Sequence, residues 1–294
     1  MRRRTALDQV DTEELDESLV DSSEPQEMSF IDHLEELRWH IIRSVSSIVI
    51  FSLAAYIYIE DIFNYVILGP KRLDFWTYRM LCKISVLLNL PNLCVKKLDF
   101  ILINREPAGQ FMMSITLSLI IGVVCAFPYA FWELWRFIKP GLRMKERKAA
   151  SGATFFVSVL FGLGVLFGYY IVTPLVINFL SNYKLDPSIA NQFDITSYIS
   201  TVSTLTLACG LMFQLPVVMF ALSKAGIVTP KFLKTYRKHA VVVILVVAAV
   251  ITPSPDVMSQ MLVAMPLFLL YEVSIWVSAS VWRKRKREEA LEEL

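Results

Sequence analysis

Apolar residues along the chain gather into six long runs, a pattern typical of helices that cross a membrane. The runs cover residues 41–59, 109–135, 150–175, 195–222, 239–252 and 258–282. The fifth holds only about twelve apolar residues before Thr252, Pro253 and Pro255 interrupt it, well short of the ~20 that a bilayer requires. We expect the sixth to tilt or end early for the same reason. The pattern therefore predicts an all-α membrane protein of six transmembrane helices, with two short C-terminal spans.

An amphipathic segment, residues 28–45, leads into the first run. Its apolar residues recur at helical spacing: Phe30, Leu34, Leu37 and Ile41. No helix breaker follows, so we expect one helix to continue from this segment into the membrane, with Glu36 and Arg38 at the membrane surface. Charged residues in that position form either a binding surface or a plain solvated face.

Proline and polar residues interrupt the apolar runs. Pro128 and Pro216 lie within the second and fourth runs and predict kinked helices, and hence a concave bundle. Gln214, beside Pro216, and Glu272, in the sixth run, either bond to neighbouring helices or serve a function, because polar groups are costly at membrane depth. Close helix packing is expected at three glycines of the third run: Gly162, Gly164 and Gly168.

Positive charges set the predicted orientation. The chain has 55% hydrophobic residues and 29 Lys and Arg, of which 16 lie in connections on the side of the N-terminus, at 136–148, 224–238 and 283–287. Because loops rich in Lys and Arg stay in the cytoplasm, both termini are predicted to be cytoplasmic.

The chain divides into three predicted regions. Residues 1–27 are acidic with few large apolar residues and are expected to form a disordered tail, residues 28–282 form the membrane domain, and residues 283–294 form a basic-then-acidic cytoplasmic tail. Residues 60–108 are long for a connection and contain apolar runs, which predicts an enlarged extracytoplasmic cap. Cys82 and Cys94 lie in this cap and form either a disulfide or two packed free thiols.

The sequence lacks the motifs of several functional classes. There are three histidines, and no HExxH, Gly-x-Ser-x-Gly or glycine-rich phosphate loop occurs. We therefore expect no metal, no cofactor and no enzymatic activity. The basic runs 143–148 and 283–287 are expected to contact membrane lipids and not nucleic acid. The alternative function is a small-solute secondary transporter, but such proteins have internal repeats and polar residues at the midplane, and we find no repeat.

Three motifs together resemble the TatC family, the receptor subunits of the twin-arginine translocase. They are FIDHLEELRWHIIRS, FWELWRFIKPGLRMKERK and ITPSPDVMSQMLVAMPLFLLYE, in order over residues 28–282. The resemblance implies a six-helix receptor in the cytoplasmic (inner) membrane that binds twin-arginine signal peptides of folded proteins. It also implies assembly with the single-span subunits TatA and TatB, self-association, and transport driven by the proton motive force.

The resemblance also implies site residues. Those expected to bind the signal peptide are Glu36, Leu37, Arg38, Phe137, Pro140 and Glu146. Glu36 and Glu146 are the acids expected to meet the paired arginines, and Glu133, where an amide is expected, adds a third acid to the site. Those expected to contact TatA or TatB are Gln214, Asp256 and Gln260. The alternative is that Glu36 pairs only with His40, and Glu146 only with Arg143 or Lys148, at helical spacing.

Overall fold

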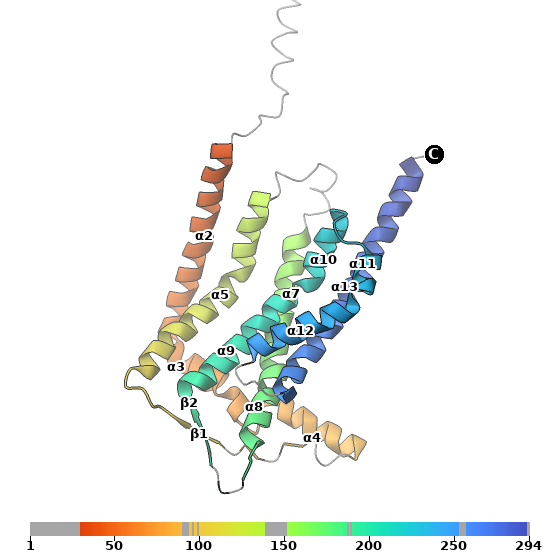
Figure 1. Cartoon of the computed structure of the whole chain (residues 1–294). Coiled ribbons are helices and arrows are strands. Elements are labelled where there is room, and N and C mark those ends of the chain that lie inside the picture. Colours follow the sequence, from red (N-terminus) through yellow and green to blue (C-terminus); the bar gives the residue numbers. More distant parts are fainter. Residues whose placement is uncertain are drawn as a thin grey trace, which may run out of the picture.

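A computed structural model describes residues 30–89, 94–95, 97–98, 100–138, 152–186, 188, 190–252 and 257–292 of the chain, and these form a helical bundle (Figure 1). The α-helices are α2 (Phe30–Ile57), α3 (Ile59–Ile62), α4 (Trp76–Leu88), α5 (Gly109–Ile138), α7 (Ala153–Phe167), α8 (Thr173–Asn182), α9 (Ile195–Met212), α10 (Leu215–Lys224), α11 (Pro230–Thr235), α12 (Arg237–Ile251) and α13 (Val257–Glu292). The π-helical turns are η1 (Phe63–Ile67) and η6 (Gly168–Val172), and η2 (Gly69–Lys71) is a 3-10 turn. The start of α2 and the end of α13 lie at the same end of the bundle (Figure 1).

Five helical stretches among the described residues are long and apolar enough to cross a membrane. They are Glu35–Ile57, Gly109–Ile138, Thr154–Asn182, Ile195–Lys224 and Ser259–Arg287. The fifth predicted run forms α12, whose 15 residues make it as short as expected. The protein is therefore a multi-pass membrane protein.

The sixth run corrects the prediction of a second short span. Helix α13 has 36 residues and contains Pro266. After Pro266 the sequence has no further proline or glycine, and its Lys, Arg, Glu, Ala and Leu residues are good helix formers. The helix therefore continues beyond the apolar run, through segment 283–287 and on to Glu292.

The third and fourth spans are interrupted, and Pro216 predicts the break in the fourth. The fourth span breaks into α9 and α10 at Phe213 and Gln214, with Pro216 in the first turn of α10, where its missing N–H costs nothing. Pro128 lies inside α5, which changes direction along its length (Figure 1). In the third span, the α-helical hydrogen bonds of α7 give way to the wider π turn η6 just before Pro174.

A small sheet corrects the all-α prediction. Strands β1 (Phe100–Ile103) and β2 (Asn191–Asp194) pair in parallel, with Phe100 opposite Asn191. The strands belong to connections about ninety residues apart, and each has only four residues. So short a run carries little period-2 signal, and no local pattern reveals a partner this distant.

Glycines allow the third and fourth spans to approach closely. A Cβ on Gly164 would lie 2.7 Å from the Cys209 carbonyl oxygen, and one on Gly168 would lie 2.8 Å from the Cys209 Cβ, whereas one on Gly162 would meet nothing within 4 Å. The expected close packing is therefore confirmed at Gly164 and Gly168 and is wrong at Gly162, which faces outward.

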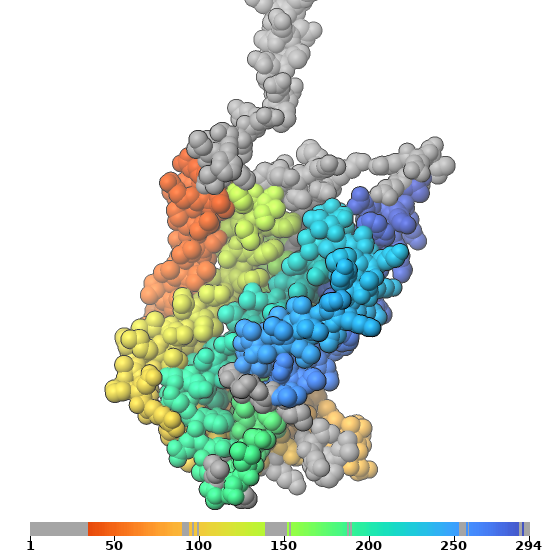
Figure 2. Space-filling view, viewed as in Figure 1, coloured from red at the N-terminus to blue at the C-terminus, as the bar shows by residue number. Residues whose placement is uncertain are grey.

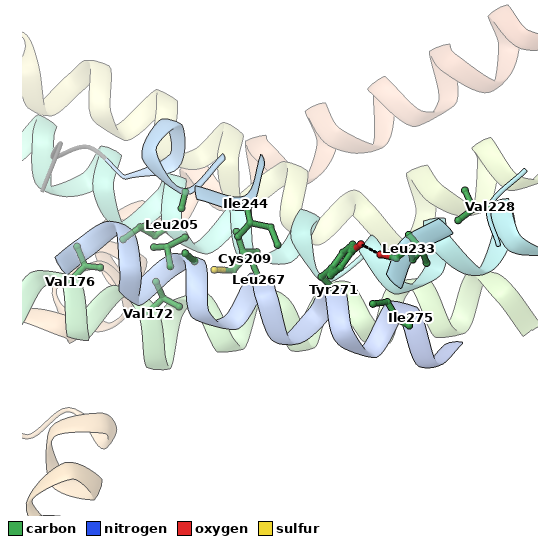
Figure 3. Packing of buried hydrophobic residues seen from close by; sticks show 13 residues of the cluster. Val172, Val176, Leu205, Cys209, Val228, Leu233, Ile244, Leu267, Tyr271 and Ile275 are labelled. Carbon is green, nitrogen blue, oxygen red and sulfur yellow. Dashed lines mark hydrogen bonds between the residues drawn. The ribbon is translucent and has the colours of Figure 1, made fainter. Parts of the chain in front are cut away.

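The larger core joins the second half of the chain (Figure 3). It includes Val176 of α8, Leu205 of α9, Ile244 of α12 and Ile275 of α13, all buried. The Tyr271 hydroxyl donates to the Leu233 carbonyl at 2.8 Å, which joins α13 to α11. Helix α12 packs on α13 and covers part of the face seen in Figure 2.

The polar residue expected in the sixth run forms an interhelical ion pair. The Glu272 carboxylate lies 2.6 Å from Arg237 Nη2 at the start of α12. Buried hydroxyls reinforce the same helix, since Ser223 Oγ of α10 donates to Ser278 Oγ at 2.7 Å. Glu272 was expected either to bond to a neighbouring helix or to serve a function, and its contact with Arg237 is a bond between helices.

The connection 60–108 folds against the ends of the spans. Helix α4 is attached through Tyr78, whose buried hydroxyl donates to the carbonyls of Pro70 (2.9 Å) and Pro174 (3.1 Å). Burial raises the pKa of this hydroxyl, which therefore remains a neutral donor. Cys82 of α4 forms a disulfide with Cys94.

Candidate functional site

Helices α2 and α5 meet in a close seam. A Cβ on Gly122 of α5 would lie 2.0 Å from Ser52 Oγ and 2.7 Å from the Ser52 backbone nitrogen, so only glycine fits there. The two helices run side by side beyond this contact (Figure 1). The seam therefore brings residues 36–43 of α2 next to residues 129–138 of α5.

A buried hydrogen bond closes the seam at this end. His40 Nδ1 donates to Glu133 Oε2 at 2.5 Å, and the two side chains are only 8% and 1% exposed. Tyr129 donates to the other carboxylate oxygen at 3.0 Å, and Arg136 Nη1 lies 3.7 Å from it. Because a buried carboxylate requires such partners, these contacts are what make an acid tolerable at position 133.

Above this pair lies an open cavity of about 370 Å³. It is lined by Glu36, Trp39, His40, Arg43 and Arg136. The side chain of Glu36 is 38% exposed, and its carboxylate is 3.9 Å from His40 Nε2, which is long for a bond that would occupy it. Glu36 therefore presents an accessible carboxylate at the mouth of the seam.

Other predicted peptide-site residues lie on the same two helices but do not line this cavity. Leu37 is half-buried, and the Phe137 ring centre lies 6.2 Å from the His40 ring centre. Arg38 is exposed and sits 3.8 Å from Glu35. Pro140 and Glu146 lie outside the described residues.

Glu133 is placed differently from the third acid that the sequence analysis expected. Its carboxylate lies inside the seam with both oxygens engaged, while Glu36 faces the cavity. Helical spacing predicts His40 only as a neighbour of Glu36 at i+4, and the contacts of Glu133 with Tyr129 and Arg136 were not predicted. Tyr129 and Arg136 lie one turn on either side of Glu133, and this i, i+4 and i, i+3 spacing is the signal that could have found them.

The residues expected to contact partner subunits do not gather at this seam. Gln214 Nε2 donates to the Val157 carbonyl at 3.1 Å, and within the described part of the chain its buried Oε1 has no hydrogen-bond partner. Gln260 Nε2 donates to the Leu245 carbonyl at 2.9 Å, which joins α13 to α12. Asp256 lies outside the described residues.

Comparison with known proteins identifies the family. The family model described as Sec-independent protein translocase protein (TatC) matches residues 32–266. The chain belongs to the TatC family. The TatC of Blattabacterium sp. subsp. Periplaneta americana is 37% identical over 265 residues, which is 90% of this chain and 99% of that protein. The TatC of Aquifex aeolicus is 33% identical over 260 residues, 88% of this chain and 98% of that protein.

Solved structures of TatC agree with the fold. A crystal structure described as the twin-arginine translocase receptor TatC is 33% identical and superposes with a TM-score of 0.63, covering 85% of this chain and 99% of that one. A second, in the detergent DDM, superposes with a TM-score of 0.67 at 33% identity and covers 84% and 99%. The protein is thus a membrane component of a protein translocase and not an enzyme.

Proposed function

We propose that the chain is the receptor subunit of a twin-arginine translocase and binds the twin-arginine signal peptides of folded proteins at the cytoplasmic membrane face. The observation that carries the proposal is the accessible Glu36 carboxylate in the cavity between α2 and α5. This cavity adjoins the end of α5 at Ile138, where the loop that contains Glu146 begins. A guanidinium presents a fixed fork of donors that a carboxylate matches, so two adjacent arginines require two separately placed acids.

The charge balance of the cavity supports a second acid. Among the described residues that line it, the single carboxylate of Glu36 already faces the guanidiniums of Arg43 and Arg136. A further pair of arginines would leave this balance strongly positive, and like charges at short range are unfavourable. Glu146, in the adjoining loop, would reduce this positive charge.

The proposed topology has six spans with both termini in the cytoplasm of a cell with a cytoplasmic (inner) membrane. Two observations favour it: α2 begins and α13 ends at one end of the bundle, and the described basic segments 224–238 and 283–287 lie toward that end. Helix α12 would be the fifth span, crossing a locally thinned or protein-lined region because it is short. Residues 60–108 would then form the extracytoplasmic cap.

Assembly with the single-span subunits TatA and TatB is proposed to involve Gln214, Asp256 and Gln260, and we propose self-association as well. The support is Gln214, whose amide nitrogen is fixed on α7 while its oxygen lacks a donor among the described residues. A polar residue on an incoming helix would supply that donor. No cofactor is involved in this proposal, and the energy would come from the proton motive force.

Peptide binding tests the receptor proposal. Affinities of a signal peptide bearing Arg-Arg or Lys-Lys are measured for the wild type, Glu36→Gln and Glu146→Gln in detergent. Each variant is expected to lose about tenfold in Arg-Arg affinity, since a charged hydrogen bond beside apolar residues is worth ~1.5–3 kcal/mol, and to lose most of its preference over Lys-Lys.

The matched control is Glu35→Gln, an exposed neighbouring acid paired with Arg38 on the same helix. It is expected to bind like the wild type, because exposed ion pairs contribute little. Retention of the Arg-Arg preference in both site variants would place recognition elsewhere.

A further inference from the structure

Helix α4 has an apolar face that no described part of the chain covers. Trp76, Met80, Ile84 and Leu87 follow one another at i, i+4, i+8 and i+11, on one side of the helix, and all are exposed. Leu87 is 82% exposed and the adjacent Val86 is 79% exposed. A continuous apolar surface of this kind marks a contact with a partner or a membrane.

The opposite face of α4 is fixed to the protein. Thr77 donates to the Tyr170 carbonyl, Tyr78 donates to the carbonyls of Pro70 and Pro174, and Cys82 is held by its disulfide. The apolar face cannot turn inward without breaking these contacts. It is therefore directed toward whatever surrounds the protein at this depth.

The depth of α4 follows from its contact with the third span. That span begins at Thr154, and Tyr170 is sixteen residues further along it. At 1.5 Å per residue this is about 24 Å, still within the ~30 Å of a hydrocarbon core or at its edge. The Trp76 ring lies 6.0 Å from the Tyr170 ring, and the Phe75 ring stacks on Tyr170 at 5.5 Å. The N-terminal end of α4 is thus level with the lipid headgroup boundary, where such aromatic rings concentrate.

Basic residues flank the apolar face. Arg79 and Lys83 lie at i+3 and i+7 from Trp76 and are exposed, and in the part of the chain that the structure describes neither has a carboxylate partner. Helix α4 also lies across the direction of the spans at that end of the bundle (Figure 1). An apolar face with a cationic edge, held crosswise at headgroup depth, is the arrangement of a helix that lies in a membrane interface.

We propose that α4 is an interfacial helix: its Trp76–Leu87 face enters the leaflet on that side of the membrane, and Arg79 and Lys83 contact phospholipid phosphates. The occupant is lipid and not a protein partner, because this face adjoins the third span at Tyr170, which is itself partly exposed in a stretch apolar enough to cross a membrane. The function would be to hold the connection 60–108 at a fixed depth beside the ends of the spans.

Tryptophan quenching by brominated lipid tests the proposal. The full chain is placed in vesicles of phosphatidylethanolamine and phosphatidylglycerol whose acyl chains carry bromine near the carbonyl end or near the methyl end. Subtracting the fluorescence of Trp76→Phe from that of the wild type isolates the Trp76 signal. This signal is expected to fall by roughly half with carbonyl-end bromine and less with methyl-end bromine, and to resist iodide in the water, as for an indole at the headgroup boundary.

Trp276, which is 77% exposed near the middle of α13, is the matched control. Its signal, isolated with Trp276→Phe, is expected to be quenched by bromolipid as well, because Trp276 lies in the membrane-crossing stretch Ser259–Arg287. A Trp76 signal quenched by iodide and not by bromolipid would show a water-exposed helix and overturn the proposal. A signal quenched by neither would show a face covered by protein, and would overturn it too.

The phosphate contact has its own variant. Arg79→Gln/Lys83→Gln is expected to reduce carbonyl-end quenching of Trp76 in vesicles that contain phosphatidylglycerol. The control is Lys71→Gln in the same connection. The Lys71 ammonium lies 5.8 Å from the centre of the Phe100 ring, and its loss is expected to leave the quenching of Trp76 unchanged. Equal quenching in the double variant and the wild type would overturn the phosphate contact.

Discussion

His40 and Glu133 are 93 residues apart in the sequence and form a buried hydrogen bond beside the candidate site. Their bond positions α2 against α5, so that the neighbouring Glu36 carboxylate remains at the cavity instead of turning into the seam. Glu133 is in this view a positioning residue for the proposed peptide site. Its contribution to binding would be indirect, through the helix that carries Glu36.

A double-mutant cycle tests this role. His40→Leu leaves the Glu133 carboxylate buried without its strongest partner and is expected to cost about 3 kcal/mol in the free energy of unfolding, while His40→Leu/Glu133→Leu recovers most of that loss. Unfolding in detergent micelles measures these two variants and Glu133→Leu, and peptide affinity is expected to fall in His40→Leu. If the costs of the two single changes simply add, the pair is not coupled.

At the scale of elements, the contact between α7 and α9 depends on a side chain that is absent. Gly164 lies against the Cys209 carbonyl and the Phe213 Cβ, at 2.7 and 2.8 Å from where its own Cβ would be. Membrane helices gain little from hydrophobic burial against each other, so close backbone approach supplies much of their packing. The π turn η6 follows immediately and carries Tyr169 and Tyr170 toward the connection 60–108, where Tyr169 donates to the Val66 carbonyl at 2.6 Å.

Two alanine substitutions on α7 separate packing from helix propensity. Gly164→Ala is expected to destabilise the protein by ~1–3 kcal/mol, because backbone atoms of α9 cannot give way to the new methyl group. Gly162→Ala, two residues away and facing open space, is expected to be neutral or to stabilise by up to ~1 kcal/mol through its better helix propensity. Thermal unfolding in micelles measures both, and equal effects would show that α7 and α9 are not packed as described.

At the scale of the whole molecule, the unpaired side-chain oxygen of Gln214 bears on assembly with other subunits. Its nitrogen joins the break between α9 and α10 to α7, and its buried oxygen has no hydrogen-bond partner among the described residues. Such an acceptor at membrane depth favours a partner helix that brings a donor. This helix–helix contact is distinct from the seam of α2 and α5, so the two proposed functions should be separable by mutation.

Gln214→Leu is expected to weaken association with TatA or TatB by ~0.6–2 kcal/mol, which is the range of interhelical hydrogen bonds, and to leave signal-peptide affinity unchanged. Co-purification from membranes and peptide binding measure the two effects. Thr206→Val is the control. It removes the Thr206 hydroxyl, another buried oxygen of the same span that has no hydrogen-bond partner among the described residues. If Gln214→Leu assembles normally, the role of Gln214 is limited to its hydrogen bond with α7.

The sequence by itself determined the helices, the shortness of α12, the break before α10 and the family. These features follow from local patterns, because a bilayer forces every spanning backbone to satisfy its own hydrogen bonds within one continuous apolar helix. The three motifs likewise lie in single continuous stretches, at Glu36 and Leu37, around Phe137, and near Gln260.

Only the tertiary structure decided what lies between those stretches. The bond from His40 to Glu133, the pairing of β1 with β2, the outward turn of Gly162 and the exposed face of α4 each depend on residues far apart in the chain. The length of α13 is by contrast a local property, since no proline or glycine follows Pro266 to end the helix where its apolar run ends. In lipid, apolar residues are tolerated on every side of a helix, so hydrophobicity alone cannot tell which side meets a neighbour. Steric fit and buried polar partners make that choice, and they exist only once the helices are packed.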